Sequence, residues 1–284
     1  MPVIHTPATA TAPATAVHYT EQGEGPALLL VHGHPFDHTM WQPQIDHFSR
    51  THRVITPDLR GYGATPLRTA PDPAPGTDGA PPATGLDAFA DDLVAVLDAL
   101  DIDDCVVAGL SMGGQIAMEL YRGHPGRVRG LVLADTFPAA ETDEGRAARN
   151  AMADRLLAGG ATAMRAYADE VLDLMVAPYN THAAPHVHRM MCATDPAGAA
   201  AALRGRAERP DYRKTLTTVP FPALVVVGRD DSYTPVADAE DMHALLPHAT
   251  LAVIEEAAHL PNLERADAFN AVLEEYLRSL GRPS

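Results

Sequence analysis

A serine at position 111 lies at the centre of the pentapeptide GLSMG, between an apolar run at 105–108 and a stretch with helical spacing at 112–121. Small residues on either side of a serine permit a sharp turn from a strand into a helix. Such a turn lifts the hydroxyl above the sheet and places it at the positive end of the helix. The pattern therefore predicts that Ser111 is a nucleophile.

A serine hydroxyl needs a base to take its proton, and the base needs a carboxylate to orient it. The chain supplies both kinds of residue after later apolar runs, as the neighbouring pair Asp230 and Asp231 and then as His259. Asp135, which ends an earlier apolar run, is a competing carboxylate. These residue types in this order indicate acyl transfer through a serine.

The elements that must position these residues alternate between two lengths. Apolar runs of strand length are separated by stretches of helical length, which is typical of a parallel sheet wrapped by helices. The runs are rich in Val, Leu, Ile and Ala, as expected for strands covered on both faces. The expected strands are 27–31, 54–56, 105–108, 131–134, 224–227 and 251–254, with an antiparallel edge hairpin around 17–20. The expected helices include 40–48, 89–100, 112–121, 237–246 and 266–280. The predicted fold class is α/β, with a mostly parallel central sheet flanked by helices.

Some segments do not fit this alternation. Residues 68–85 are rich in proline and glycine, a composition that cannot build a core, so we expect a Pro-rich loop insertion there. Residues 139–219 are far longer than an ordinary crossover and show helical patches, which predicts an inserted helical cap over the sheet. Residues 1–16 are mostly Pro, Ala and Thr, and we expect a flexible N-terminal tail. The core then comprises residues 17–138 and 220–284.

Five motifs occur in order along nearly the whole chain: HGHP at 32–35, PDLRGYG at 57–63, GLSMGG at 109–114, GRDDSYTP at 228–235 and AAHLPNLE at 257–264. On these motifs the chain resembles the α/β-hydrolase superfamily, close to its branch of small serine esterases, lactonases and C–C hydrolases. The resemblance implies the α/β-hydrolase fold. The serine at position 111 counts against epoxide hydrolases and haloalkane dehalogenases, which the same family builds on an aspartate nucleophile.

The resemblance also implies roles for individual residues. Ser111 would be the nucleophile and His259 the general base and then acid. The family spacing places the catalytic carboxylate three residues after Gly228, which favours Asp231. That carboxylate would fix the imidazole tautomer and stabilise the imidazolium. Asp135 stays an alternative, because some α/β hydrolases carry the acid at that strand end.

The oxyanion hole implied by the resemblance consists of two backbone N–H groups, those of His34 and Met112. Phe36 and His38 flank the loop that carries His34 and are candidate substrate contacts. The family reaction requires no cofactor and no metal. The histidines at 182, 186 and 188 have metal-ligand spacing, but no acidic or thiolate partner lies beside them in a ligand pattern.

The composition of the chain disfavours some classes of binding partner. Over 284 residues, Lys plus Arg number 21 and Asp plus Glu 37, and this formal charge of −16 disfavours nucleic acid. No apolar run approaches the roughly 18 residues of a membrane helix. Two cysteines without a disulfide pattern, and an N-terminus without signal-peptide features, favour the cytoplasm. The composition leaves the oligomeric state open.

The predicted function is a serine hydrolase that cleaves a carboxylic ester or lactone through an acyl-enzyme intermediate. A methionine-rich cap predicts a covered, mainly apolar pocket, and the loop around His34 offers no fixed cation, so we expect small, mainly apolar, neutral substrates. A C–C-bond hydrolase, a thioesterase and a cofactor-free lyase are alternatives on the same fold. A non-catalytic ligand-binding receptor is less favoured, because such a protein has no need of the whole triad.

Overall fold

The computed structural model describes residues 1–8, 13–68 and 83–281. In these residues one eight-stranded sheet has the order β1-β2-β4-β3-β5-β6-β7-β8. The strands are β1 (Val3–Thr6), β2 (Thr15–Gln22), β3 (Ala27–Val31), β4 (Arg53–Pro57), β5 (Cys105–Leu110), β6 (Val128–Ala134), β7 (Ala223–Gly228) and β8 (Ala249–Ile254). Strands β3 to β8 are parallel, whereas β1 and β2 pair antiparallel at one side.

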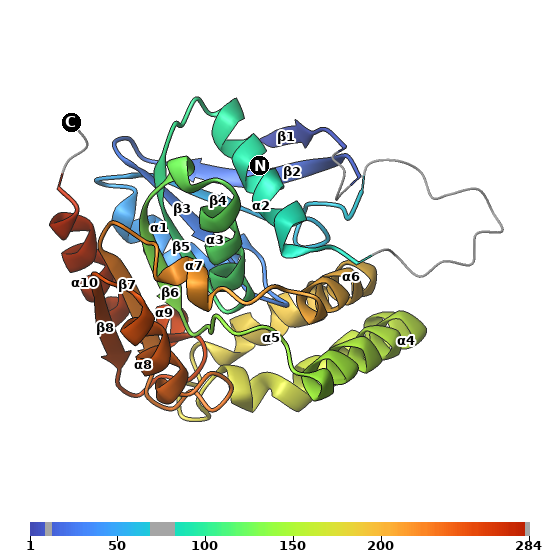
Figure 1. The fold of residues 1–284 in the computed structure, drawn as a ribbon. Coiled ribbons are helices and arrows are strands. Elements are labelled where there is room, and N and C mark those ends of the chain that lie inside the picture. The colour runs from blue at the N-terminus through green and yellow to red at the C-terminus, as the bar shows by residue number, and fades with distance from the viewer. Residues whose placement is uncertain (9–12, 69–82, 282–284) are drawn as a thin grey trace.

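The central strands are apolar on both faces because both faces are covered. On β3, Leu29 and Val31 enter one core, while Leu28 and Leu30 enter the other. Helices α2 (Leu86–Ala99), α3 (Met112–Gly123) and α8 (Val236–Leu245) contribute to the first core, and α1 (Gln42–Phe48) and α10 (Ala266–Ser279) to the second. Figure 1 shows α2 and α3 in front of the sheet. The α/β class with a mostly parallel sheet is therefore confirmed.

Between β6 and β7 the chain forms α4 (Asp143–Met175), α5 (Ala184–Ala193) and α6 (Pro196–Ala207), which gather beside one another in Figure 1. We call these three helices the helical insertion. Non-helical φ and ψ angles at Gly160 (56° and −141°) divide α4 into two parts. At the start of α6, Gly198 packs directly on the core, because a Cβ there would lie 2.0 Å from the carbonyl oxygen of Gly61.

Short elements complete the described chain: the 3-10 helices η1 (His38–Trp41) and η2 (Pro125–Arg127), and the helices α7 (Arg213–Leu216) and α9 (Pro261–Glu264). Of the predicted Pro-rich loop at 68–85, residues 69–82 lie outside the described residues. No described helix combines the length and the apolar composition needed to cross a membrane.

The N-terminal segment differs from our expectation of a flexible tail over residues 1–16. Strand β1 adds to the sheet, and Val3 pairs with His18 of β2. The Oγ1 of Thr6 is buried and donates to Oδ1 of Asp92 on α2 at 3.1 Å. The four residues of β1 thus gain a strand partner, and Thr6 also gains a buried carboxylate.

Candidate active site

Ser111 lies at the turn from β5 into α3, in a backbone conformation that L-residues rarely adopt (φ 56°, ψ −117°). The flanking glycines make this turn possible. A Cβ on Gly109 would lie 2.1 Å from the carbonyl oxygen of Gly113, and a Cβ on Gly113 would lie 2.1 Å from that of Val31. Strained φ/ψ values persist only where the surroundings over-determine them, and they cluster at functional sites.

His259 and Asp231 lie after β8 and β7, and the parallel pairing of these strands brings them together. The Nδ1 of His259 lies 2.8 Å from Oδ2 of Asp231. The carboxylate also accepts from the amide of Tyr233 at 2.8 Å and from the amide and hydroxyl of Thr234 at 3.0 and 2.5 Å. Burial by itself raises the pKa of Asp231, but His259 and Thr234 outweigh it and hold the pKa below its ordinary value.

An ionised Asp231 accepts the proton of Nδ1, so the other ring nitrogen of His259 is an acceptor. That Nε2 is buried and has no hydrogen-bond partner among the described residues. His259 and Ser111 line the same pocket. The nitrogen that would take a proton is therefore unengaged beside the candidate nucleophile.

Asp135, the competing carboxylate, lies directly after β6 and next to the pair. One of its carboxyl oxygens, one of those of Asp231 and a ring nitrogen of His259 lie within 4.8 Å of one another. Its Oδ1 accepts from the amide of Gly228 at 2.9 Å, and its Oδ2 has no partner in the described part of the chain. Burial, and then the charge of Asp231, raise the pKa of Asp135 well above its ordinary value. Of the two aspartates, Asp231 carries the charge and the direct bond to His259.

Glu264 holds the loop that carries His259. Its Oε1 accepts from the amides of Ala258 and Leu260, on either side of the histidine, at 3.0 and 3.1 Å. Its Oε2 accepts from the amide of Ala177 at 2.8 Å and from the side chain of Asn180 at 2.7 Å, just after α4. This buried carboxylate therefore joins the segment that follows α4 to the loop that carries His259.

The two residues predicted to supply the amides of an oxyanion hole, His34 and Met112, both lie close to Ser111. Met112 is the first residue of α3, so its N–H has no intrahelical acceptor. His34 lines the pocket, and a Cβ on the preceding Gly33 would lie 3.2 Å from the Cβ of Ser111. The His34 Nδ1 lies 2.7 Å from the hydroxyl of Tyr62. Burial, and then the charges of two arginines, lower the pKa of His34 well below its ordinary value.

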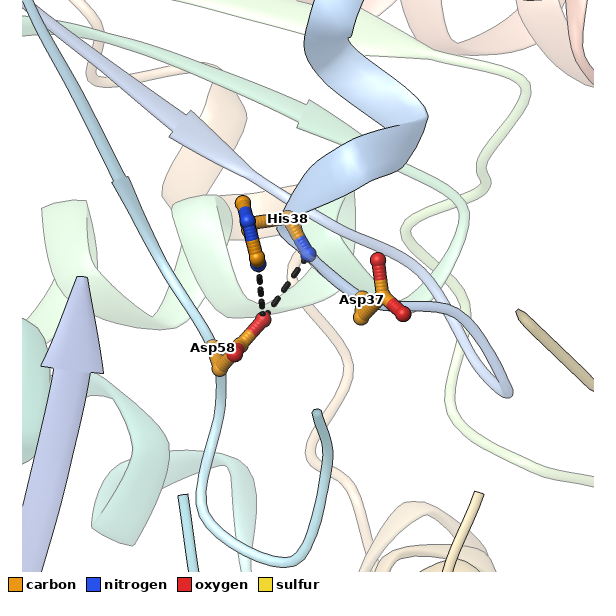
Figure 2. Close-up of side chains that lie close together, drawn as sticks. All are labelled: Asp37, His38 and Asp58. Carbon is orange, nitrogen blue, oxygen red and sulfur yellow. Dashed lines mark hydrogen bonds and ion pairs between the residues drawn. The ribbon is translucent and has the colours of Figure 1, made fainter. Parts of the chain in front are cut away.

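Phe36 and His38 do not line the pocket beside Ser111. Phe36 is fully buried in the core. The backbone N–H of His38 donates to Oδ1 of Asp58 at 2.9 Å, and its Nδ1 lies 2.7 Å from the same oxygen; Figure 2 shows both contacts. Asp37, also drawn in Figure 2, binds Thr39 at the start of η1 instead. In this structure Phe36 packs in the core and His38 braces the loop, and their role as substrate contacts stays a prediction.

The pocket beside Ser111, which we expected to be covered and mainly apolar, has a volume of about 40 Å³ and has Val171, Leu174 and Met175 of α4 in its wall. It also contains Arg149 of α4 and Arg206 of α6. The expectation that no fixed cation would lie near the nucleophile is therefore wrong.

Sequence reasoning missed Arg206 because it did not predict α6. The helix consists mostly of alanine and glycine and has no apolar stripe to mark it. One signal was present in the sequence, since Arg206 follows Ala202 and Leu203 at helical spacing and so shares a face with small apolar residues. An arginine on such a face is a candidate buried cation.

We compared the chain with known protein families. The family model described as the alpha/beta hydrolase fold matches residues 26–266. The chain belongs to this family.

This alpha/beta hydrolase is 29% identical to 3-oxoadipate enol-lactonase 2 of Acinetobacter baylyi, over 98% of its own length and 99% of the relative's. It is 27% identical to the pimeloyl-acyl-carrier-protein methyl ester esterase of Aliivibrio salmonicida, over 93% and 97%. Among solved structures, a thermophilic esterase from Thermogutta terrifontis with malate bound has a TM-score of 0.90 at 30% identity and is covered to 99%, as is this chain. The relatives are named hydrolases, and the chain is an alpha/beta hydrolase enzyme.

Proposed function

We propose that this enzyme hydrolyses a carboxylic ester or lactone through an acyl-enzyme on Ser111. The observation that carries the proposal is the His259–Asp231 pair at 2.8 Å, whose unengaged Nε2 shares a pocket with the serine. Ser-His-Asp geometry of this kind activates a hydroxyl on several unrelated folds.

In the first step the hydroxyl proton of Ser111 passes to Nε2 of His259 while Oγ forms a bond to the carbonyl carbon. The negative charge on the carbonyl oxygen is met by the N–H groups of Met112 and His34. The C–O bond to the leaving group then breaks, and the alkoxide takes the proton from His259. Asp231 stabilises the imidazolium throughout.

In the second step a water molecule gives a proton to His259 and attacks the acyl carbon. The bond to Ser111 breaks, its oxygen regains the proton, and the carboxylic acid leaves. A lactone follows the same path, with its own alkoxide as the leaving group, so that one hydroxy acid is the product.

The names of the relatives support ester and lactone substrates over the C–C-bond, thioester and lyase alternatives. One relative is an enol-lactonase and another a methyl ester esterase. The narrow pocket favours short acyl groups. Cytoplasmic location stays a prediction from the cysteine content.

The proposal is tested with the purified wild-type chain and its Ser111→Ala variant on short methyl esters, a lactone and a matched thioester. We expect the wild type to cleave ester or lactone best and the variant to lose several orders of magnitude in kcat. An organophosphonate should label the wild type on Ser111. Labelling at another residue, or near-native turnover by Ser111→Ala, would overturn the assignment.

A further inference from the structure

The guanidinium of Arg206 is buried next to the candidate nucleophile. The residue is 2% exposed and lines the pocket with Ser111 and His259. Its Nε donates to Oε1 of Gln115 at 3.1 Å, and no carboxylate in the described part of the chain forms an ion pair with it. No described carboxylate pairs with its two terminal nitrogens, and the Tyr233 hydroxyl lies close to this guanidinium.

A second guanidinium adds to this positive charge. Arg149 lines the same pocket and pairs with Glu141. Glu141 also pairs with Arg209 at 2.7 Å, so one carboxylate serves two arginines while Arg206 has none. The cluster of Arg149, Arg206 and Arg209 with Glu141 thus carries an excess of positive charge.

This excess of positive charge shifts the pKa of neighbouring groups. Burial raises the pKa of Tyr233, but the charges of Arg206 and then Arg149 outweigh it and bring the pKa below its ordinary value. Burial, and next the charge of Arg149, lower the pKa of Arg206 to about 10, which leaves it protonated at neutral pH. The pocket therefore combines a reactive serine with a positive potential.

A buried charge without a counter-charge is costly in free energy, so a protein retains one where a ligand supplies the opposite charge. We propose that the pocket binds a substrate whose acyl part carries its own carboxylate, and that Arg206, assisted by Arg149, is the residue that recognises it. This inference rests on the proposed function, because it names the substrate class of the same site.

The geometry fits a carboxylate. The terminal nitrogens of a guanidinium form a planar fork that matches two carboxylate oxygens, and Gln115 already holds the Nε side of Arg206 in place. Because Arg206 and Ser111 line the same small pocket, we take the spacer between that carboxylate and the carbonyl at Ser111 to be short. Short half-esters of dicarboxylic acids and small lactone acids are the corresponding substrates, and their hydrolysis by one water yields a dicarboxylic or a hydroxy dicarboxylic acid.

The test compares monomethyl succinate with methyl butanoate, which carries a methyl group in place of the carboxylate. We expect the wild type to prefer monomethyl succinate in kcat/KM. The variant Arg206→Met should lose about 10- to 100-fold more in kcat/KM on monomethyl succinate than on methyl butanoate, mainly through KM. Arg206→Lys should retain part of the preference, because it keeps the charge without the fork.

Arg204→Met is the matched control, since Arg204 lies on the same helix but pairs with Asp154 at the surface. It should leave both esters unaffected. A wild-type preference for methyl butanoate, or an equal loss on both esters in Arg206→Met, would overturn the proposal.

Succinate binding to the Ser111→Ala protein, measured by calorimetry, separates this inference from the proposed function. Succinate should bind that protein and bind much more weakly once Arg206→Met is added. If neither ester is cleaved by the wild type, the hydrolase proposal fails while this binding result still decides on the carboxylate site. Equal succinate affinity with and without Arg206 would refute it.

Discussion

The Asp135→Asn variant should have a larger free energy of unfolding than the wild type, and this difference should increase as the pH rises. Burial and the adjacent charge of Asp231 hold the pKa of Asp135 well above its ordinary value. In the unfolded chain an aspartate ionises near pH 3.9. Above that pH the unfolded state releases a proton that the folded state keeps, so this residue costs stability increasingly until its folded pKa is reached.

The size of the effect follows from linkage. One proton held only by the folded state changes the free energy of unfolding by about 1.4 kcal/mol per pH unit. Between pH 5.5 and 7.5 the advantage of Asp135→Asn over wild type should therefore grow by as much as about 2.7 kcal/mol. Asparagine suits the site because it tolerates the positive φ of 44° and its oxygen can accept from the amide of Gly228.

The assay is urea unfolding of both proteins at several pH values across this window. Glu141→Gln is the control, because the pKa of Glu141 is shifted in the opposite direction. The arginine partners of Glu141 outweigh burial and lower its pKa to about 2. Its stabilising contribution is fully present above the unfolded pKa, so the loss in Glu141→Gln should stay constant over the same window. An advantage of Asp135→Asn that is flat or shrinks with pH would show that Asp135 is ionised, and would refute the reasoning.

Three further changes test the site. Asp231→Asn should lower kcat by about 10⁴-fold, because His259 would then hold the wrong tautomer, while Asp135→Asn keeps most of the activity; steady-state kinetics on one ester compares them. Ser111→Gly should unfold at a higher temperature than Ser111→Ala in a thermal melt, because glycine relieves a backbone strain of about 1–3 kcal/mol, and equal melting temperatures would contradict that strain. Glu264→Gln should reduce the free energy of unfolding by about 2 kcal/mol and lower kcat as the His259 loop loosens; unchanged values in urea unfolding and kinetics would count against that bracing role.

Local chemistry made much of the fold predictable. The expected strand at 27–31 coincides with β3, because its residues are buried on both faces and its turns are marked at each end. The strand–turn–helix around Ser111 was equally visible, since its glycines are required by the close contacts that the structure shows. The positions after apolar runs marked His259 and the pair Asp230 and Asp231 as candidates, and only the family resemblance favoured Asp231.

What could not be predicted depends on contacts between distant segments. Strand β1 has only four residues, and its stability comes from pairing with β2 and from the buried bond between Thr6 and Asp92. Arg206 reaches the pocket because α6 packs on α4 and on the loop at Gly61, an arrangement that no local pattern encodes. We did not predict a cation near Ser111 because the position of Arg206 depends on this packing and not on a sequence motif.

The four hydrogen bonds accepted by Glu264 have a mechanical consequence. They tie the segment just after α4, at Ala177 and Asn180, to the same carboxylate that anchors the loop of His259. An outward movement of this end of the helical insertion would therefore displace the loop that carries His259 relative to Ser111. Leu174 and Tyr233, which line the pocket, are 42% and 40% exposed, so the pocket reaches the surface beside the segment that Glu264 holds.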